Sequence, residues 1–295
     1  MKLQGVFAPL ATPFDHRGDF RPAKLRDNIG KWNLSSLAGY LIAGSSGEGP
    51  LLTADEKVLV WETAAASAAG RLLIAGASAE STRETVLLVN RAAELGYRAA
   101  LVRTPSYYRT LMSAPDAQKL HFRAVADQAR IPVILYNRPQ ATGIGLEVET
   151  VAELSAHPNI AGMLECPGGP ARIALLARQL GPGFPVLAGS AAELWPSLEA
   201  GACGAVVSLA NPAPYGVIAL WEAFRAREEE TGQELQQKIR PAARLIENRL
   251  GIPGMKCAMD LNGYYGGPPR LPLCLPGAAA RQEIEQAFAP LRDWS

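Results

Sequence analysis

The chain has 295 residues, of which 48% are hydrophobic and 19% are charged, and its 29 basic and 28 acidic residues leave a formal net charge of +1. This apolar content is enough for one large core, which excludes a disordered chain. The balanced charge, without a basic patch or stripe, argues against a nucleic-acid partner.

The cysteines and histidines are scattered along the chain, with no CxxC pair and no metal-ligand spacing, so we expect neither a disulfide scaffold nor a metal site. They are Cys166, Cys203, Cys257 and Cys274, and His16, His121 and His157. The N-terminus has no long apolar core typical of a signal peptide, and no run reaches the length of a membrane span. We therefore expect a cytoplasmic protein that does not enter a membrane.

Short apolar runs alternate with longer amphipathic stretches from the N-terminus onward. The runs are continuous and rich in Val, Ile, Leu and Ala, which is typical of strands covered on both faces. In chain order they are Gly5–Leu10, Gly39–Gly44, Leu72–Gly76, Ala99–Arg103, Val133–Tyr136, Ile160–Leu164, Pro185–Ala188 and Ala205–Leu209.

Helices are predicted between these strands, for example over Thr53–Ala69 and Ser81–Leu95. Each starts with a capping-box pattern, a hydroxyl residue followed three positions later by a glutamate. Beyond about residue 210 the pattern becomes helical, with one Gly/Pro-rich interruption. These segments are Tyr215–Glu229, Gln233–Arg249, the interruption Gly263–Pro276, and a last helix near Ala279–Ala289.

Eight strand–helix units in alternation predict an α/β fold, a closed (β/α)₈ TIM barrel. The alternative is an open, doubly wound sheet, but its glycine-rich GxGxxG turn is missing after the first strand, where the chain reads Ala11–Phe14. We expect one domain, with the barrel over residues 1–210. Residues 211–295 would then hold the last barrel helix and a C-terminal helical appendage.

In such barrels the active site lies at the C-terminal ends of the strands, and four segments there carry candidate chemistry. The segment Gly44–Gly49 offers two hydroxyls and backbone N–H groups for a carboxylate, although an ordinary turn has the same composition. Thr104–Tyr108 and Tyr136–Pro139 contain tyrosines that would relay protons or merely pack. Asn159–Glu165 reads as a plain strand.

Taken together, these segments resemble the dihydrodipicolinate synthase and N-acetylneuraminate lyase superfamily. Gly44–Glu48 resembles its GxxGE loop, Tyr136-Asn137 its YN motif, Gly189-Ser190 its turn after strand seven, and Val206–Ser208 its strand-eight segment. Four further stretches are most similar to 4-hydroxy-2-oxoglutarate aldolase: Leu73–Gly76 with Glu80–Thr82, Thr104–Arg109, Gly251–Lys256 and Gly263–Pro268.

The resemblance implies a lyase or aldolase that acts on a small 2-oxo acid, such as pyruvate, without a cofactor. It implies that the substrate carboxylate binds at Ser45, Ser46 and Gly47, and that Tyr136 relays protons. Tyr108 would support the site of a neighbouring subunit, because the family forms dimers and tetramers. The remaining contacts implied are at Gly189 and Val207.

One residue departs from the family pattern. The lysine that forms a Schiff base with the 2-oxo carbon should stand between Met163 and Glu165, where this chain has Leu164. A lysine amine attacks the carbonyl and the resulting iminium accepts electrons, whereas leucine provides no nucleophile. None of the chain's lysines lies at the end of a predicted strand.

Two function classes therefore stay open: a lyase of this family, and an inactive or regulatory homologue that binds a small carboxylate. The arginine that dihydrodipicolinate synthases carry shortly after the YN motif is also absent. Arg103 and Arg138 end adjacent strands, so they either restore positive charge at the mouth or pair with helix carboxylates. In the first case Arg138 would bind a second anionic group of the ligand.

Overall fold

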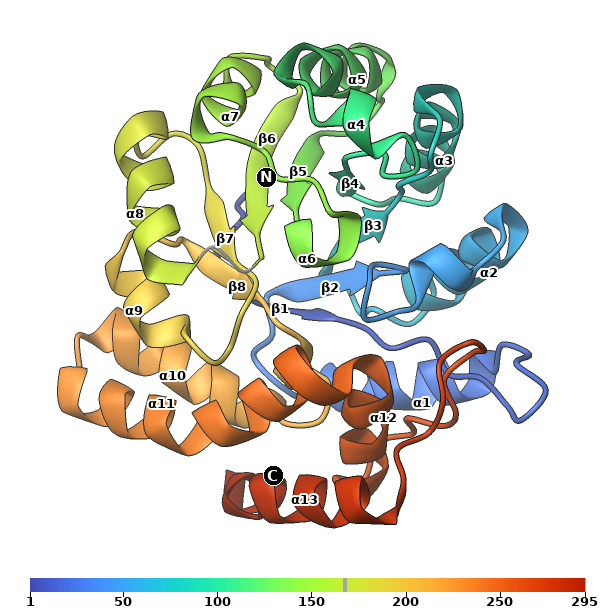
Figure 1. Cartoon of the computed structure of the whole chain (residues 1–295). Helices are drawn as coiled ribbons and strands as arrows, with labels where there is room; N and C mark the ends of the chain where they lie inside the picture. Colours follow the sequence, from blue (N-terminus) through green and yellow to red (C-terminus); the bar gives the residue numbers. More distant parts are fainter. Residues whose placement is uncertain (167–168, 295) are drawn as a thin grey trace.

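The structure is a computed structural model that describes residues 1–166 and 169–294. Eight parallel strands close into a barrel in sequence order, which confirms the predicted TIM barrel (Figure 1). The strands are β1 (Gly5–Pro9), β2 (Gly39–Ile42), β3 (Leu72–Gly76), β4 (Ala99–Arg103), β5 (Val133–Asn137), β6 (Ile160–Glu165), β7 (Val186–Ala188) and β8 (Gly204–Val206).

Helices surround the barrel (Figure 1). In the first two thirds of the chain they are α1 (Pro22–Trp32), α2 (Ala54–Ala65), α3 (Thr82–Glu94), α4 (Arg109–Met112), α5 (Pro115–Gln128), α6 (Pro139–Thr142), α7 (Val148–Ser155), α8 (Gly169–Leu180) and α9 (Leu194–Glu199), with the short 3₁₀ turn η1 (Gly49–Leu51). The first capping box is complete, because Thr53 and Glu56 each bond the other's backbone N–H. At the second, Ser81 caps the N–H of Glu84.

The C-terminal part is helical, as predicted, and packs along one side of the barrel (Figure 1). It comprises η2 (Ser208–Ala210), α10 (Pro214–Ala226), α11 (Glu229–Arg244), the π-helical turn η3 (Leu245–Leu250), α12 (Gly251–Leu261), α13 (Ala278–Phe288) and η4 (Ala289–Trp294). Helix α12 was not predicted, since its sequence begins Gly-Ile-Pro-Gly. Pro253 is tolerated because the first N–H groups of a helix have no partner within it.

The apolar side chains form two buried clusters. The larger lies between the strands and the helices, where Trp32, Trp61 and Phe122 are fully buried. The smaller fills the barrel interior and includes Tyr136 and Leu164. Because these side chains fill the barrel interior, a ligand would bind at the polar C-terminal ends of the strands.

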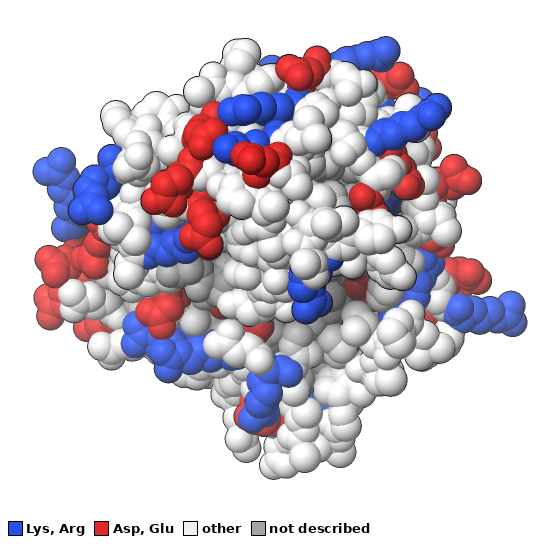
Figure 2. Space-filling model, turned by 45° about the horizontal axis from the view of Figure 1, so that its top comes forward, with Lys and Arg blue, Asp and Glu red and all other residues white. Residues whose placement is uncertain are grey.

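The described part of the chain contains no helix long and apolar enough to cross a membrane. On the face drawn in Figure 2, acidic and basic side chains are interspersed around the periphery. Among the described residues, no group of three or more His, Cys, Asp and Glu side chains is placed to hold a metal ion.

Candidate active site

A cleft of about 700 Å³ opens where β2, β5, β6, β7 and β8 end. Its far wall is formed by η3 and the start of α12, so the C-terminal helices complete it. The polar groups that matter for chemistry are Ser45, Ser46, Arg138, Cys166, Ser190, Ser208 and Glu247. The volume suits a small organic ligand.

The loop after β2 presents two hydroxyls to this cleft. Ser45 Oγ lies 3.1 Å from the Tyr136 hydroxyl, and Ser46 Oγ lies 2.9 Å from Ser208 Oγ. The N–H groups of Glu48 and Gly49 are used inside the loop, where they donate to the carbonyls of Ser45 and Gly44. A carboxylate in this loop would therefore depend on the hydroxyls more than on these two N–H groups.

Glu48 fixes the shape of the loop. Its backbone is left-handed, with φ of 56°, a conformation that costs a non-glycine residue about 1 kcal/mol. Its carboxylate lies 2.5 Å from Lys256 Nζ, with both side chains fully buried, and accepts the N–H of Arg270 at 2.7 Å. Lys256 also donates to the carbonyl of Pro268. The appendage thus holds the loop through a buried ion pair.

Tyr136 lies near the end of β5, where it lines the smaller pocket that adjoins the cleft at Ser45. Its hydroxyl is shared between Ser45 and Arg138, whose Nη1 donates to the phenol oxygen at 3.4 Å. Burial raises the pKa of the Tyr136 hydroxyl, and the neighbouring Arg138 acts in the opposite direction. The phenol is therefore protonated at neutral pH and remains a donor.

The two arginines at the ends of β4 and β5 point in different directions. Arg138 turns into the cleft. Arg103 is held by Glu80, whose carboxylate accepts its Nη2 at 2.6 Å and also the N–H groups of Ser106 and Tyr107. These bonds outweigh the effect of burial and lower the pKa of Glu80 to about 2. Arg138 therefore lines the cleft, whereas Arg103 lines the smaller pocket beside Tyr136.

Leu164 is 2% exposed and packs in the barrel interior, paired in register with Tyr136 on β5. Cys166, two residues further on, reaches the cleft and lies against Gly189, where an added Cβ would meet its sulfur at 1.7 Å. Burial raises the pKa of the Cys166 thiol to about 12. Its thiol is therefore neutral beside the ligand space.

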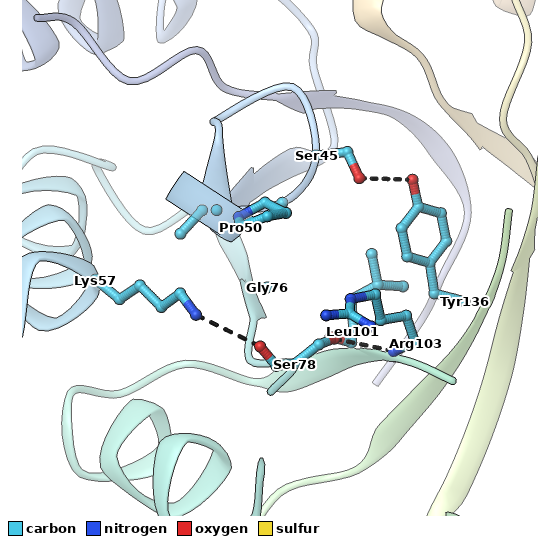
Figure 3. A pocket seen from close by; sticks show the side chains of 11 residues that line it. Ser45, Pro50, Lys57, Gly76, Ser78, Leu101, Arg103 and Tyr136 are labelled. Carbon is cyan, nitrogen blue, oxygen red and sulfur yellow. Dashed lines mark hydrogen bonds between the residues drawn. The ribbon is translucent and has the colours of Figure 1, made fainter. Parts of the chain in front are cut away.

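A smaller pocket of about 40 Å³ adjoins Tyr136 and Ser45 on the side of α2 (Figure 3). It contains Lys57, which sequence analysis did not place near the site because it lies on a helix. Figure 3 shows the Lys57 amine directed at Ser78, and it donates to the Ser78 carbonyl at 3.4 Å. Lys57 lies on the opposite side of the pocket from Tyr136. Burial lowers the pKa of Lys57. This space is too small for a 2-oxo acid.

Glu247 on η3 is a second residue that sequence analysis missed. Its carboxylate accepts the Ser190 hydroxyl at 2.7 Å and the N–H of Ala191 at 2.7 Å, both from the loop after β7. The side chain lines the cleft and interacts with the charge of Arg138. No motif marked it, since it lies in the appendage beyond the eight strands.

The other expected site residues lie around the cleft. Gly189 lines it. Gly47 and Val207 are buried beside it, with the carbonyl of Gly47 accepting the Thr12 hydroxyl at 2.6 Å. Tyr108 is 69% exposed and contacts the ring of Tyr107 edge to face. Tyr108 therefore lies on the outer surface of the chain.

The sequence profile of the Dihydrodipicolinate synthetase family matches residues 2–289. The chain belongs to this family. It is a family of pyruvate-dependent aldolases and lyases, as the GxxGE and YN segments indicated. The match spans the barrel and most of the helical appendage.

Relatives and solved structures agree with this assignment. The chain is 39% identical to a 4-hydroxy-tetrahydrodipicolinate synthase of Xanthomonas axonopodis pv. citri, covering 98% of this chain and 94% of that one. It is 32% identical to a probable mitochondrial 4-hydroxy-2-oxoglutarate aldolase of Emericella nidulans, covering 97% and 94%. Dihydrodipicolinate synthase from Aquifex aeolicus superposes with a TM-score of 0.91 at 28% identity, covering 97% of both chains.

Proposed function

We propose that this protein is a lyase that holds a small 2-oxo acid, such as pyruvate, without a covalent bond and reacts through an enolate. The observation that carries the proposal is the contact of Arg138 Nη1 with the Tyr136 hydroxyl, above a buried Leu164. The family resemblance puts a lysine at position 164. In this chain the cation beside Tyr136 is instead a guanidinium, which does not attack a carbonyl.

In this proposal each group has a separate task. Ser45 and Ser46 donate to the substrate carboxylate, and the backbone beside Gly189 borders the ligand. Arg138 and the Tyr136 phenol donate to the 2-oxo oxygen, on which negative charge grows as the enolate forms. Donors fixed in advance toward a developing oxyanion are an effective source of catalysis. Tyr136 then relays protons at carbon 3, and no cofactor takes part.

We further propose a homo-oligomer, a dimer or a tetramer. The exposed pair Tyr107 and Tyr108 supports an interface at this position, since such aromatic residues are frequent in protein contacts. Tyr108 would then contribute to the neighbouring site. Sedimentation at micromolar concentration tests the assembly, and a monomeric mass would contradict it.

The test of the reaction is exchange of the methyl hydrogens of pyruvate in D₂O, followed by proton NMR. Enolate formation at carbon 3 predicts enzyme-dependent loss of the methyl signal. Tyr136→Phe should reduce the rate by about 10²-fold or more, the usual effect of losing a proton-transfer group. A wild-type rate equal to that of buffer would contradict the proposal.

The second candidate is a homologue that binds a small carboxylate without turnover. Leu164 favours it, because hydrocarbon at this position removes the family's nucleophile. Calorimetry, combined with the methyl-exchange measurement, distinguishes the lyase from the binding protein. Heat of binding for pyruvate without methyl exchange would support the binding protein, and binding with exchange would support the lyase.

A further inference from the structure

We propose that Glu247 is the catalytic base that removes the proton from a substrate hydroxyl two carbons away from the oxo carbon. The inference rests on the proposed function and adds a residue to it. It follows from the position of Glu247 on the wall of the cleft that Ser45 and Arg138 also line, with Arg138 in contact with the Tyr136 hydroxyl.

Of the described residues lining the cleft, two are carboxylates, Glu48 and Glu247. Glu48 is fully buried against Lys256 and is also bonded to the N–H of Arg270, so it is occupied within the protein. Glu247 is held differently. One oxygen accepts the Ser190 hydroxyl and the other the N–H of Ala191, and the backbone of Ala192 also interacts with the carboxylate. A carboxylate has about four lone-pair directions, so it can accept a further bond from a ligand.

The loop that holds Glu247 is itself rigidly held. Gln236 on α11 donates to the carbonyls of Ala191 and Ala192, and its oxygen accepts the N–H of Trp195. Glu247 follows on η3, a π-helical turn, which is a local distortion frequent at functional sites. The carboxylate is thus fixed relative to the barrel before a ligand arrives.

The charges that face Glu247 come from the neighbouring strand ends. Arg138 approaches from β5, and Cys166 from β6 carries a neutral thiol. Burial raises the pKa of Glu247, against the hydrogen bonds from Ser190, Ala191 and Ala192 and the charge of Arg138. A carboxylate with a raised pKa is a better proton acceptor near neutral pH.

The reaction balances without an oxidant or a second reactant. Glu247 takes the hydroxyl proton at carbon 4, the C–O bond there becomes a carbonyl, and the bond between carbons 3 and 4 breaks. Its electron pair forms the double bond between carbons 2 and 3, and the oxo oxygen becomes an enolate oxygen beside Arg138 and Tyr136. The Tyr136 phenol protonates carbon 3 to release the shorter 2-oxo acid. The proton on Glu247 returns through solvent to Tyr136.

The experiment compares wild type with Glu247→Gln, using 4-hydroxy-2-oxoglutarate and measuring release of pyruvate. We expect Glu247→Gln to lose about 10²-fold or more in kcat/KM. Its pyruvate affinity by calorimetry should stay within about twofold, because Ser45, Ser46 and Arg138 hold pyruvate in the proposed function. Glu193→Gln is the matched control, since this surface glutamate on the same loop pairs with Arg244 outside the cleft.

A further variant tests the role if Glu247→Gln is poorly folded. Ser190→Ala removes a hydrogen bond that lowers the pKa of Glu247, so the acid limb of the pH profile of kcat/KM should move to higher pH. An unshifted limb, or cleavage by Glu247→Gln at the wild-type rate, overturns the role of Glu247. If wild type neither cleaves this compound nor exchanges the pyruvate methyl group, the proposed function itself fails.

Discussion

Arg138 Nη1 donates to the Tyr136 hydroxyl at 3.4 Å, and Arg138, the residue directly after β5, lines the cleft. Arginine remains charged at any pH at which the protein is folded, and its fork of N–H donors matches a carboxylate or an oxyanion. The pair therefore combines a fixed positive charge with a proton donor at one point of the cleft.

Replacing Arg138 tests this combination directly. Arg138→Met should weaken pyruvate binding by about 10- to 100-fold, because a hydrogen bond to a charged group contributes about 1.5–3 kcal/mol. Calorimetric titration measures the affinity. Arg244→Met is the control, since Arg244 pairs with Glu193 outside the cleft. Equal affinity in wild type and Arg138→Met would show that the guanidinium does not contact the ligand.

Restoring the family's nucleophile tests the role assigned to position 164. Leu164→Lys places an amine next to Tyr136 in the register of β5 and β6. We expect pyruvate and borohydride to add a stable adduct to this variant, detected by intact mass. Leu164→Met, which keeps the side chain apolar, should give none. A folded Leu164→Lys protein without an adduct would mean that the lysine position lies elsewhere.

The ion pair between Glu48 and Lys256 should govern stability. Lys256→Met leaves the Glu48 charge buried without its partner, which typically costs about 3–5 kcal/mol. Urea unfolding should show this loss, and the double variant Glu48→Gln with Lys256→Met should recover part of it. If Lys256→Met unfolds at the wild-type urea concentration, the pair does not hold the loop as described.

His121 should make the free energy of unfolding depend on pH. Burial, with a smaller effect of Arg103, lowers its pKa from 6.5 to about 4, and its Nδ1 lies 2.8 Å from the Thr82 hydroxyl. As pH falls from about 6.5 to about 4, the unfolded chain binds a proton that the folded chain does not, so stability is lost over this interval.

The size of this effect follows from the same shift. The difference between 6.5 and about 4 corresponds to on the order of 3 kcal/mol for this one group. His121→Gln should flatten the pH dependence of the unfolding free energy between these values. An unchanged slope in the variant would show that other groups produce it.

The sequence predicted the barrel well because each strand is a continuous apolar run, and it placed Tyr136 and Ser45 at the C-terminal ends of such runs. It did not reveal which way Arg138 points, since that depends on its contact with Tyr136. Glu247 and Lys57 were missed for a common reason. Both lie on helical segments, and only the packing of the chain brings them to the strand ends.

The central claim, that a 2-oxo acid is held without a covalent bond, is tested most directly on the wild-type protein. It is incubated with pyruvate and borohydride, and its intact mass is compared with that of the untreated protein. We predict an unchanged mass. A stable adduct on any lysine would contradict the claim, and Lys57, which shares a pocket with Tyr136, is the first lysine to examine.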